Sequence, residues 1–330
     1  MKKRHINKKF IKKHLRFNKS KKAYKYKSKN IFLLILKLRR ILIFLIVIII
    51  VLIFIWFYNK RSNSKLIVSM TSHPPRINYA HESIETILSQ TLKPDKFILW
   101  LAESDFPEKE KNLPETLLLL EKKGLTIKYY KKNLKQYLKL IPTLKYYPNS
   151  IIITVDDDII YRKDMIEKLY KNYLKYPKDI QAHRITKFEY IKEKFITIGG
   201  GAHYYNNSSF LNKLTGVGGV LYPPNCFYKD ILNDNLFMSL APTNDDQWFW
   251  VQAILNGVRV RVIENPDFEL HYVKNTQKTG LVNKNDYGPH LFWKDFKRLI
   301  SYYSELKTIL INEYNSYVNK NLIKIVFNSE

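Results

Sequence analysis

Three consecutive aspartates, Asp156 to Asp158, directly follow an apolar run in the stretch SIIITVDDDIIYRKDM, residues 150–165. The Ile, Thr and Val residues before them are typical of a buried strand. Adjacent carboxylates at the end of such a strand need a compensating cation. Because Mg²⁺ and Mn²⁺ take carboxylate oxygens and often bridge to phosphates, we interpret the triplet as a metal site.

The spacing within the triplet separates its members. In an extended chain Asp156 and Asp158 point the same way and Asp157 the opposite way, which favours the outer two as metal ligands. The alternative is a surface turn in which an aspartate caps the helix that follows.

A second acidic pair, Asp245 and Asp246, lies in the stretch APTNDDQWFWVQAILNGVRV, residues 241–260. The pattern predicts a helix opened by Thr243, with Asp246 as its capping-box partner. Such a cap does not exclude chemistry, because a carboxylate also suits a general base.

Glycines are concentrated just before that segment. Six of the ten glycines lie within residues 199–219, where they permit close backbone approach to a ligand. No Lys-Ser or Lys-Thr follows in the required place, which excludes a Walker-type phosphate loop. A plain turn with a bulge is the alternative for Gly218 and Gly219.

Several polar residues stand where a nucleotide could bind. Thr71, Ser72 and Arg76 follow the first predicted strand, and Lys139 could reach a phosphate. A solvated surface charge is the alternative for Arg76 and Lys139. The single cysteine, Cys226, excludes an internal disulfide framework and a four-cysteine zinc site.

The elements that position these residues alternate along the chain. Apolar runs predict strands at 65–70, 96–101, 125–130 and 150–155. Helical spacing is found at 81–92, 113–124, 134–147 with a break around Pro142, and 163–177. This order predicts an α/β fold with a mostly parallel sheet covered on both faces, in which ligands bind at the carboxyl ends of the strands.

The positive charge of the chain is concentrated at its start. Residues 1–40 hold 17 Lys and Arg and no acidic residue, whereas residues 65–330 hold 37 against 29 acidic residues. A block of like charge is usually disordered and contacts something anionic. Because an apolar run follows, lipid contact is favoured over nucleic-acid binding.

That apolar run, Ile41 to Tyr58, contains 18 uncharged residues and would be about 27 Å long as a helix. We expect an uncleaved transmembrane anchor over 31–58; a cleaved signal peptide is the alternative. Seventeen cationic residues before the span and three soon after it predict a single pass with a cytoplasmic amino terminus. This topology would put the catalytic domain across the membrane; a hairpin or monotopic anchor, which keeps both sides in the cytoplasm, is the alternative.

With these residues in view, the chain resembles glycosyltransferases of the GT-A fold, particularly bacterial family 2-type enzymes. The resemblance covers roughly residues 66–285 and is most specific at TVDDDIIY and NDDQWFW. It implies that the aspartate motif holds Mn²⁺ or Mg²⁺ on the diphosphate of a nucleotide sugar, such as a UDP-sugar. Asp156 would contact ribose or metal, Asp157 the donor and Asp158 the metal, and His271 would complete the metal site.

The same resemblance extends to donor and acceptor. Where many family 2 enzymes have an acidic pair, this chain has LWLAESDF, so Glu103 or Asp105 would contact the nucleoside. Asp246 would be the base of an inverting transfer and Asp245 would orient the acceptor. The acceptor side would also include Gly218, Gly219 and Trp248.

The sequence therefore predicts five parts: a basic tail (1–30), an anchor (31–58), a linker (59–65), a catalytic domain (66–290) and a helical extension (291–330). The expected function is a membrane-anchored, metal-dependent glycosyltransferase acting on a glycan or lipid-linked acceptor. A nucleotidyltransferase and a non-enzymatic, membrane-tethered binder of anionic polymer remain as alternatives.

Overall fold

The computed structural model describes residues 38–52, 64–198, 208–264, 269–277 and 291–327. The chain divides into two units, Met1–Asn63 and Ser64–Glu330. In the first unit, residues 38–52 form a helix whose side chains are exposed. No helix among the described residues is long and apolar enough to cross a membrane. The predicted anchor, 31–58, extends past the described residues at both ends, and it stays a prediction.

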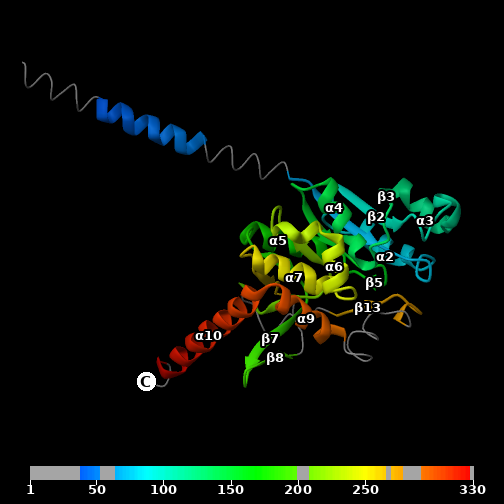
Figure 1. Ribbon diagram of the computed structural model, residues 1–330. Helices are drawn as coiled ribbons and strands as arrows, with labels where there is room; N and C mark the ends of the chain where they lie inside the picture. The colour runs from blue at the N-terminus through cyan, green and yellow to red at the C-terminus, as the bar shows by residue number, and fades with distance from the viewer. Residues whose placement is uncertain (1–37, 53–63, 199–207, 265–268, 278–290, 328–330) are drawn as a thin grey trace, which may run out of the picture. The chain divides into compact units, whose positions relative to one another are not determined.

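A mixed sheet of eight strands forms the centre of the second unit (Figure 1). The strands lie in the order β3 (Leu125–Tyr130), β2 (Lys96–Ala102), β1 (Leu66–Thr71), β4 (Ile151–Thr154), β11 (Val220–Tyr222), β6 (Ile180–Ala182), β12 (Val260–Val262) and β9 (Ser208–Ser209). Pairing is parallel from β3 through β4 and again between β6 and β12. β11 and β9 pair antiparallel with their neighbours.

The sheet separates two hydrophobic cores, because successive side chains of a strand point to opposite faces. In β1, Ile67 belongs to one core, whereas Val68 and Met70 belong to the other. The first core is covered by α4 (Ile141–Tyr146), α6 (Asp234–Leu240), α7 (Asp245–Leu255), α9 (Leu291–Tyr302) and α10 (Ser304–Phe327). The second is covered by α2 (Ala80–Leu88), α3 (Glu115–Leu118) and α5 (Met165–Lys175). Helices on both faces of a largely parallel sheet confirm the predicted α/β class.

Two smaller sheets complete the unit. β7 (Ile185–Ile191) pairs with β8 (Lys194–Ile198) and with β10 (Asn212–Leu214), and all three strands are antiparallel. β5 (Ile159–Ile160) pairs with β13 (His271–Tyr272) directly after the aspartate triplet. Short 3₁₀ helices cover Lys109–Asn112, Leu119–Lys123, Lys135–Lys139 and Lys229–Leu232.

Local chemistry explains where several elements end. Gly124, with φ +111°, follows the 3₁₀ helix Leu119–Lys123 in the left-handed conformation that glycine adopts without strain. The helix predicted over 134–147 is divided at Leu140 into a 3₁₀ helix and α4, with Pro142 in the first turn of α4.

Candidate active site

The aspartate triplet lies at the carboxyl end of β4, between the ends of β1 and β11. The chain turns at Asp157 and Asp158 before β5 begins, so it is not extended there. The predicted alternation is therefore wrong. Asp157 and Asp158 both face Arg76, whereas Asp156 faces Lys139.

Arg76 binds the second half of the triplet. Its Nη1 lies 3.0 Å from Asp157 Oδ1 and 3.0 Å from Asp158 Oδ2. Ser72 donates a hydrogen bond of 2.6 Å to the other oxygen of Asp157, and Gln277 donates one of 3.0 Å to Asp158. Both predicted donor-binding residues after β1, Ser72 and Arg76, thus position the triplet itself.

Lys139 connects the triplet to the second acidic pair. Its Nζ lies 3.2 Å from Asp156 Oδ1, 3.0 Å from Asp245 Oδ2 and 3.9 Å from Asp246 Oδ1. The lysine is only 6% exposed, so its charge is compensated by these carboxylates rather than by water. The surface-charge alternative for Lys139 is therefore wrong.

Asp245 and Asp246 occupy the first turn of α7. Asp246 Oδ2 accepts a hydrogen bond of 2.8 Å from the backbone N–H of Gly216, in the glycine-rich segment before β11. A Cβ at position 216 would lie 2.8 Å from Lys139 Nζ and 2.9 Å from Asp246 Oδ1. Glycine here allows the close approach of backbone, lysine and aspartate.

Burial and like charge shape the electrostatics of the site. Burial, reinforced by Asp156, raises the pKa of Asp158 to about 6 although Arg76 opposes this. Burial also raises the pKa of Asp245 to about 6, against the effect of Lys139 and with that of Asp246. Burial would lower the pKa of Lys139, but Asp156, Asp245 and Asp246 raise it well above its ordinary value.

The structure corrects the capping box predicted for Asp246. α7 begins after Asn244 rather than at Thr243, and Asp246 accepts its hydrogen bond from Gly216 instead. The loop before α7 is held by Asp295 of α9, which is fully buried and accepts hydrogen bonds from Thr243 and Asn244.

Trp248 is also corrected, because its side chain is 0% exposed. The indole packs against Phe237 and Tyr303 and donates a hydrogen bond of 3.2 Å to the carbonyl of Ile231. Trp248 is a core residue, and its predicted contact with an acceptor is wrong.

The remaining predicted site residues lie around this centre. Thr71 Oγ1 donates a hydrogen bond of 2.8 Å to the carbonyl of Trp100, and Glu103 is exposed at the end of β2. His271 is exposed on β13, opposite Ile160 of β5, with its Nε2 3.6 Å from a carboxylate oxygen of Glu269.

Gly218 and Gly219 both have positive φ, at +99° and +96°. A Cβ on Gly219 would lie 2.9 Å from Met165 Sδ, so this glycine lets the loop pack on α5. The sequence prediction that these two glycines bind the acceptor stays a prediction.

Three residues of the site were missed by sequence analysis. The Tyr161 hydroxyl accepts a hydrogen bond of 2.7 Å from the Asp156 backbone N–H, Gln277 contacts Asp158, and Gly216 contacts Asp246. Only Gly216 could have been found from the sequence, as a member of the glycine-rich stretch. Long-range side-chain contacts such as that of Gln277 leave no local sequence pattern.

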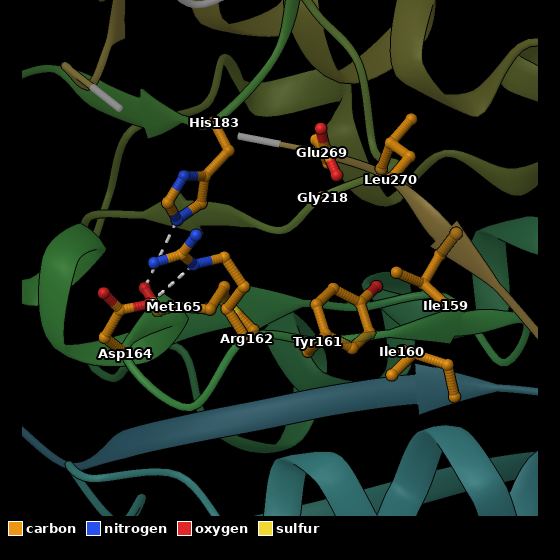
Figure 2. A pocket seen from close by; sticks show the side chains of 10 residues that line it. All are labelled: Ile159, Ile160, Tyr161, Arg162, Asp164, Met165, His183, Gly218, Glu269 and Leu270. Carbon is orange, nitrogen blue, oxygen red and sulfur yellow. Dashed lines mark hydrogen bonds and ion pairs between the residues drawn. The ribbon is translucent and has the colours of Figure 1, made fainter. Parts of the chain in front are cut away.

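A small pocket adjoins the triplet, between β5, the start of α5 and Gly218 (Figure 2). Tyr161, Arg162, Asp164 and His183 line it, and His183 Nε2 lies 3.3 Å from the carbonyl of Met165. Tyr161 is shared between this pocket and the triplet, which places the pocket directly beside the metal-binding candidates.

The described residues contain no group of three or more His, Cys, Asp and Glu side chains arranged to hold a metal. Asp156 and Asp158 nevertheless fit a divalent cation, since Mg²⁺ is often bound by one or two carboxylates together with phosphates and water. The ion pairs to Lys139 and Arg76 use Oδ1 of Asp156 and Oδ2 of Asp158. Asp156 also raises the pKa of Asp158, as expected of neighbouring carboxylates.

No protein-family model matches the chain, and no curated protein matches its sequence. Among solved structures, the chain is similar to TarS of S. aureus in complex with UDP-GlcNAc, at 17% identity and a TM-score of 0.41, with 63% of this chain and 57% of that chain covered. A second structure of S. aureus TarS, residues 1–349, gives 16% identity, a TM-score of 0.42 and coverages of 63% and 59%. The chain thus spans less than two thirds of the TarS chain.

A mannosyltransferase from Pyrobaculum calidifontis, in complex with GDP-Man and Mn²⁺, matches at 11% identity and a TM-score of 0.40, with 68% of this chain and 65% of that chain covered. Since these TM-scores all lie below 0.5, the functional proposal rests on the residues of this chain.

Proposed function

We propose that the chain is a GT-A glycosyltransferase that moves a sugar from a nucleotide sugar to a glycan or lipid-linked acceptor, with inversion and with a divalent metal. One observation carries the proposal. Asp156, directly after β4, and the two aspartates that open α7 converge on the buried side chain of Lys139, at the carboxyl ends of parallel strands. Ligands of open α/β sheets bind at that edge.

Asp156 and Asp158 would hold the metal, Mn²⁺ or Mg²⁺. When bound, the metal stabilises the negative charge of the departing nucleoside diphosphate, so that no protein acid is needed there. Ser72 and Arg76 fix Asp157 and Asp158, which keeps the triplet in place while the donor enters. On this proposal Glu103, exposed at the end of β2, contacts the nucleoside.

Asp246 would act as the base that removes a proton from the acceptor hydroxyl during attack on the anomeric carbon. The Gly216 N–H orients one oxygen of this carboxylate, and the other lies 3.9 Å from Lys139. Asp245, buried against Lys139, fixes the position of that lysine beside the base. The site would therefore combine a positioned base, Asp246, with two carboxylates, Asp156 and Asp158, that could hold the metal.

Membrane anchoring through residues 31–58, with a cytoplasmic amino terminus, is part of the proposal. It is supported by the 18-residue apolar run and by its flanking cations. The membrane would bring the enzyme to lipid-linked or surface glycan acceptors.

Turnover of a panel of nucleotide sugars, with and without Mn²⁺, tests the proposal. We expect release of a nucleoside diphosphate with one donor, dependence on the metal, and a product of inverted anomeric configuration. Release of pyrophosphate from a nucleoside triphosphate would indicate a nucleotidyltransferase instead. Failure to bind any nucleotide would favour a non-enzymatic binder of anionic polymer.

A further inference from the structure

The outer face of α9 presents cations between two exposed aromatic rings. Residues four apart share a helix face, so Trp293, Lys297 and Ser301 form one row, and Lys294, Arg298 and Tyr302 form the next. Trp293 at one end is 37% exposed and Tyr302 at the other is 55% exposed.

The opposite face of α9 is packed, so this orientation is fixed. Asp295, Phe296 and Leu299 are buried, and Phe296 contacts Trp250 of α7. The two faces agree with the amphipathic, basic and aromatic character of this segment. One side of α9 therefore belongs to the core and the other side is exposed to solvent.

The exposed face borders an open groove of about 540 Å³. We call it the α9 groove; it is lined by Leu240, Lys294, Lys297, Arg298, Ser301 and Tyr302. The lining contains three cations and no acidic residue. Asp295, which pairs with Arg298, is fully buried on the inner side. The groove is thus complementary to anionic groups.

We infer that the α9 groove docks the domain on an anionic membrane, with Lys294 and Lys297 contacting lipid phosphates, whereas Arg298 pairs with Asp295 and donates a hydrogen bond of 2.9 Å to the carbonyl of Leu240. Aromatic rings flanking cations on a helix that lies at a surface suit the interface between head groups and acyl chains. On the proposed anchoring through residues 31–58, this domain would stay attached to a membrane. A polyanionic acceptor is the competing occupant.

Docking through α9 would bear on the active site. Gln247 of α7 donates a hydrogen bond of 3.0 Å to the carbonyl of Phe292, and Asn244 donates one of 2.9 Å to Asp295. α9 is therefore bonded to the helix that carries Asp245 and Asp246. A lipid-linked acceptor would meet that helix from the membrane side.

Sedimentation with vesicles tests the inference without any substrate, so it stands or falls separately from the proposed reaction. Residues 64–330 are suitable because they contain all three sheets and both hydrophobic cores. We expect this unit to bind phosphatidylcholine vesicles that contain phosphatidylglycerol, to ignore pure phosphatidylcholine vesicles, and to be released by salt.

The double variant Lys294→Glu/Lys297→Glu should bind the anionic vesicles roughly tenfold or more weakly. The matched control is Lys111→Glu/Lys122→Glu, which makes the same charge change at exposed residues outside the groove and should bind as the parent does. All of these lysines are exposed, so thermal unfolding should stay unchanged.

Three results would overturn the inference: equal loss of binding in both double variants, equal binding of the parent to neutral and anionic vesicles, or parental vesicle binding by the groove variant. If the groove variant binds vesicles normally but turns over its acceptor slowly, the groove serves an anionic acceptor.

Discussion

Lys139 is the residue on which both acidic groups of the site depend. Removing its charge would leave Asp156, Asp245 and Asp246 to repel one another in a buried setting.

Asp158→Asn should lower kcat by roughly 10²-fold or more, because a neutral amide is a poor ligand for a metal that stabilises the leaving group. The shape of the side chain and its contact with Gln277 can be kept, so thermal unfolding should change little. Asp179→Asn is a matched control, since Asp179 pairs with Arg261 away from the site. Near-normal turnover with saturating Mn²⁺ would show that Asp158 is not a metal ligand.

Asp246→Asn should leave the nucleotide sugar bound but lower kcat by roughly 10²-fold or more, as expected when a positioned base is lost. An asparagine oxygen can still accept the hydrogen bond from Gly216, so the comparison isolates the charge. Single-turnover kinetics measure the loss of rate, and titration with the donor measures whether the nucleotide sugar still binds. A product that retains the anomeric configuration of the donor would contradict the role of a base.

Gly216→Ala should lower kcat roughly tenfold to a hundredfold, since the new methyl group displaces Lys139 and Asp246 and small misplacements are costly in catalysis. Gly257→Ala provides the contrast. Gly257 has φ +72° and open space around it, so alanine there should cost about 1 kcal/mol of stability without changing kcat. Measurements of kcat and thermal unfolding should therefore show a fall in kcat for Gly216→Ala and a loss of stability without a fall in kcat for Gly257→Ala. Similar kcat values in the two variants would refute the steric argument.

Sequence reasoning at this scale singled out residues that the structure brings together, and it misjudged several of their contacts. The triplet stood out because charge follows apolar residues, and the Asp245–Asp246 pair because it opens a predicted helix. Their orientation could not be predicted, because one turn at Asp157 and Asp158 reverses the alternation. Lys139 was predicted to meet a phosphate, but its carboxylate partners come from two distant segments. Trp248 was misassigned because an aromatic residue beside an acidic pair has the same pattern whether it faces the core or a ligand.

At the scale of elements, strands were predicted closely and helix ends less well. β1, β2, β3 and β4 match the apolar runs, since a short buried strand is read from its composition. The helix predicted to open at Thr243 begins only at Asp245, because Asp295 of another helix holds the two residues before it. A contact with a residue 50 positions away leaves no local signal.

His183, buried beside Met165 at the start of α5, gives a prediction about acid stability. Burial lowers the pKa of His183 to about 4, from 6.5, and Lys168 and Arg162 act in the same direction while Asp164 opposes them. The unfolded chain therefore binds a proton below pH 6.5 that the folded chain takes up only near pH 4. Stability should fall by about 3 kcal/mol as the pH drops through this window.

Denaturant unfolding between pH 7 and pH 4 measures this effect. His183→Gln should be less stable at pH 7, where the packed imidazole is lost, but its stability should depend less on pH. If the free energy of unfolding depends on pH equally in the parent and in His183→Gln, then His183 is not the source of the pH dependence.

At the scale of the whole molecule, the proposed anchor and the active site belong to different units of the chain. Residues 64–330 without the first unit should therefore retain turnover of a soluble acceptor within about tenfold, since effective concentration at a membrane, not chemistry, is lost. A comparison of kcat for the full chain and this unit checks the prediction. Loss of nucleotide binding in the shorter chain would contradict it.

The orientation in the membrane is tested on the full chain. Seventeen cations before the apolar run predict that the amino terminus is cytoplasmic and that the following domain lies across the membrane. In sealed vesicles with the cytoplasmic side out, a carboxyl-terminal tag should be protected from protease. Cleavage of the tag would instead indicate a hairpin or monotopic anchor.

The position of β4 within the sheet has a consequence for how the chain is synthesised. β4 pairs with β1 on one side and with β11 on the other, and β11 is completed only at Tyr222. Until then the strand that leads into the triplet has one unpaired edge, and Asp245 has not yet been synthesised. A lysine is costly to bury without its counter-charges, so Lys139 must stay hydrated through that interval. The active site is therefore among the last parts of the domain to assemble, and nascent chains that end before α7 should remain sensitive to protease around Lys139.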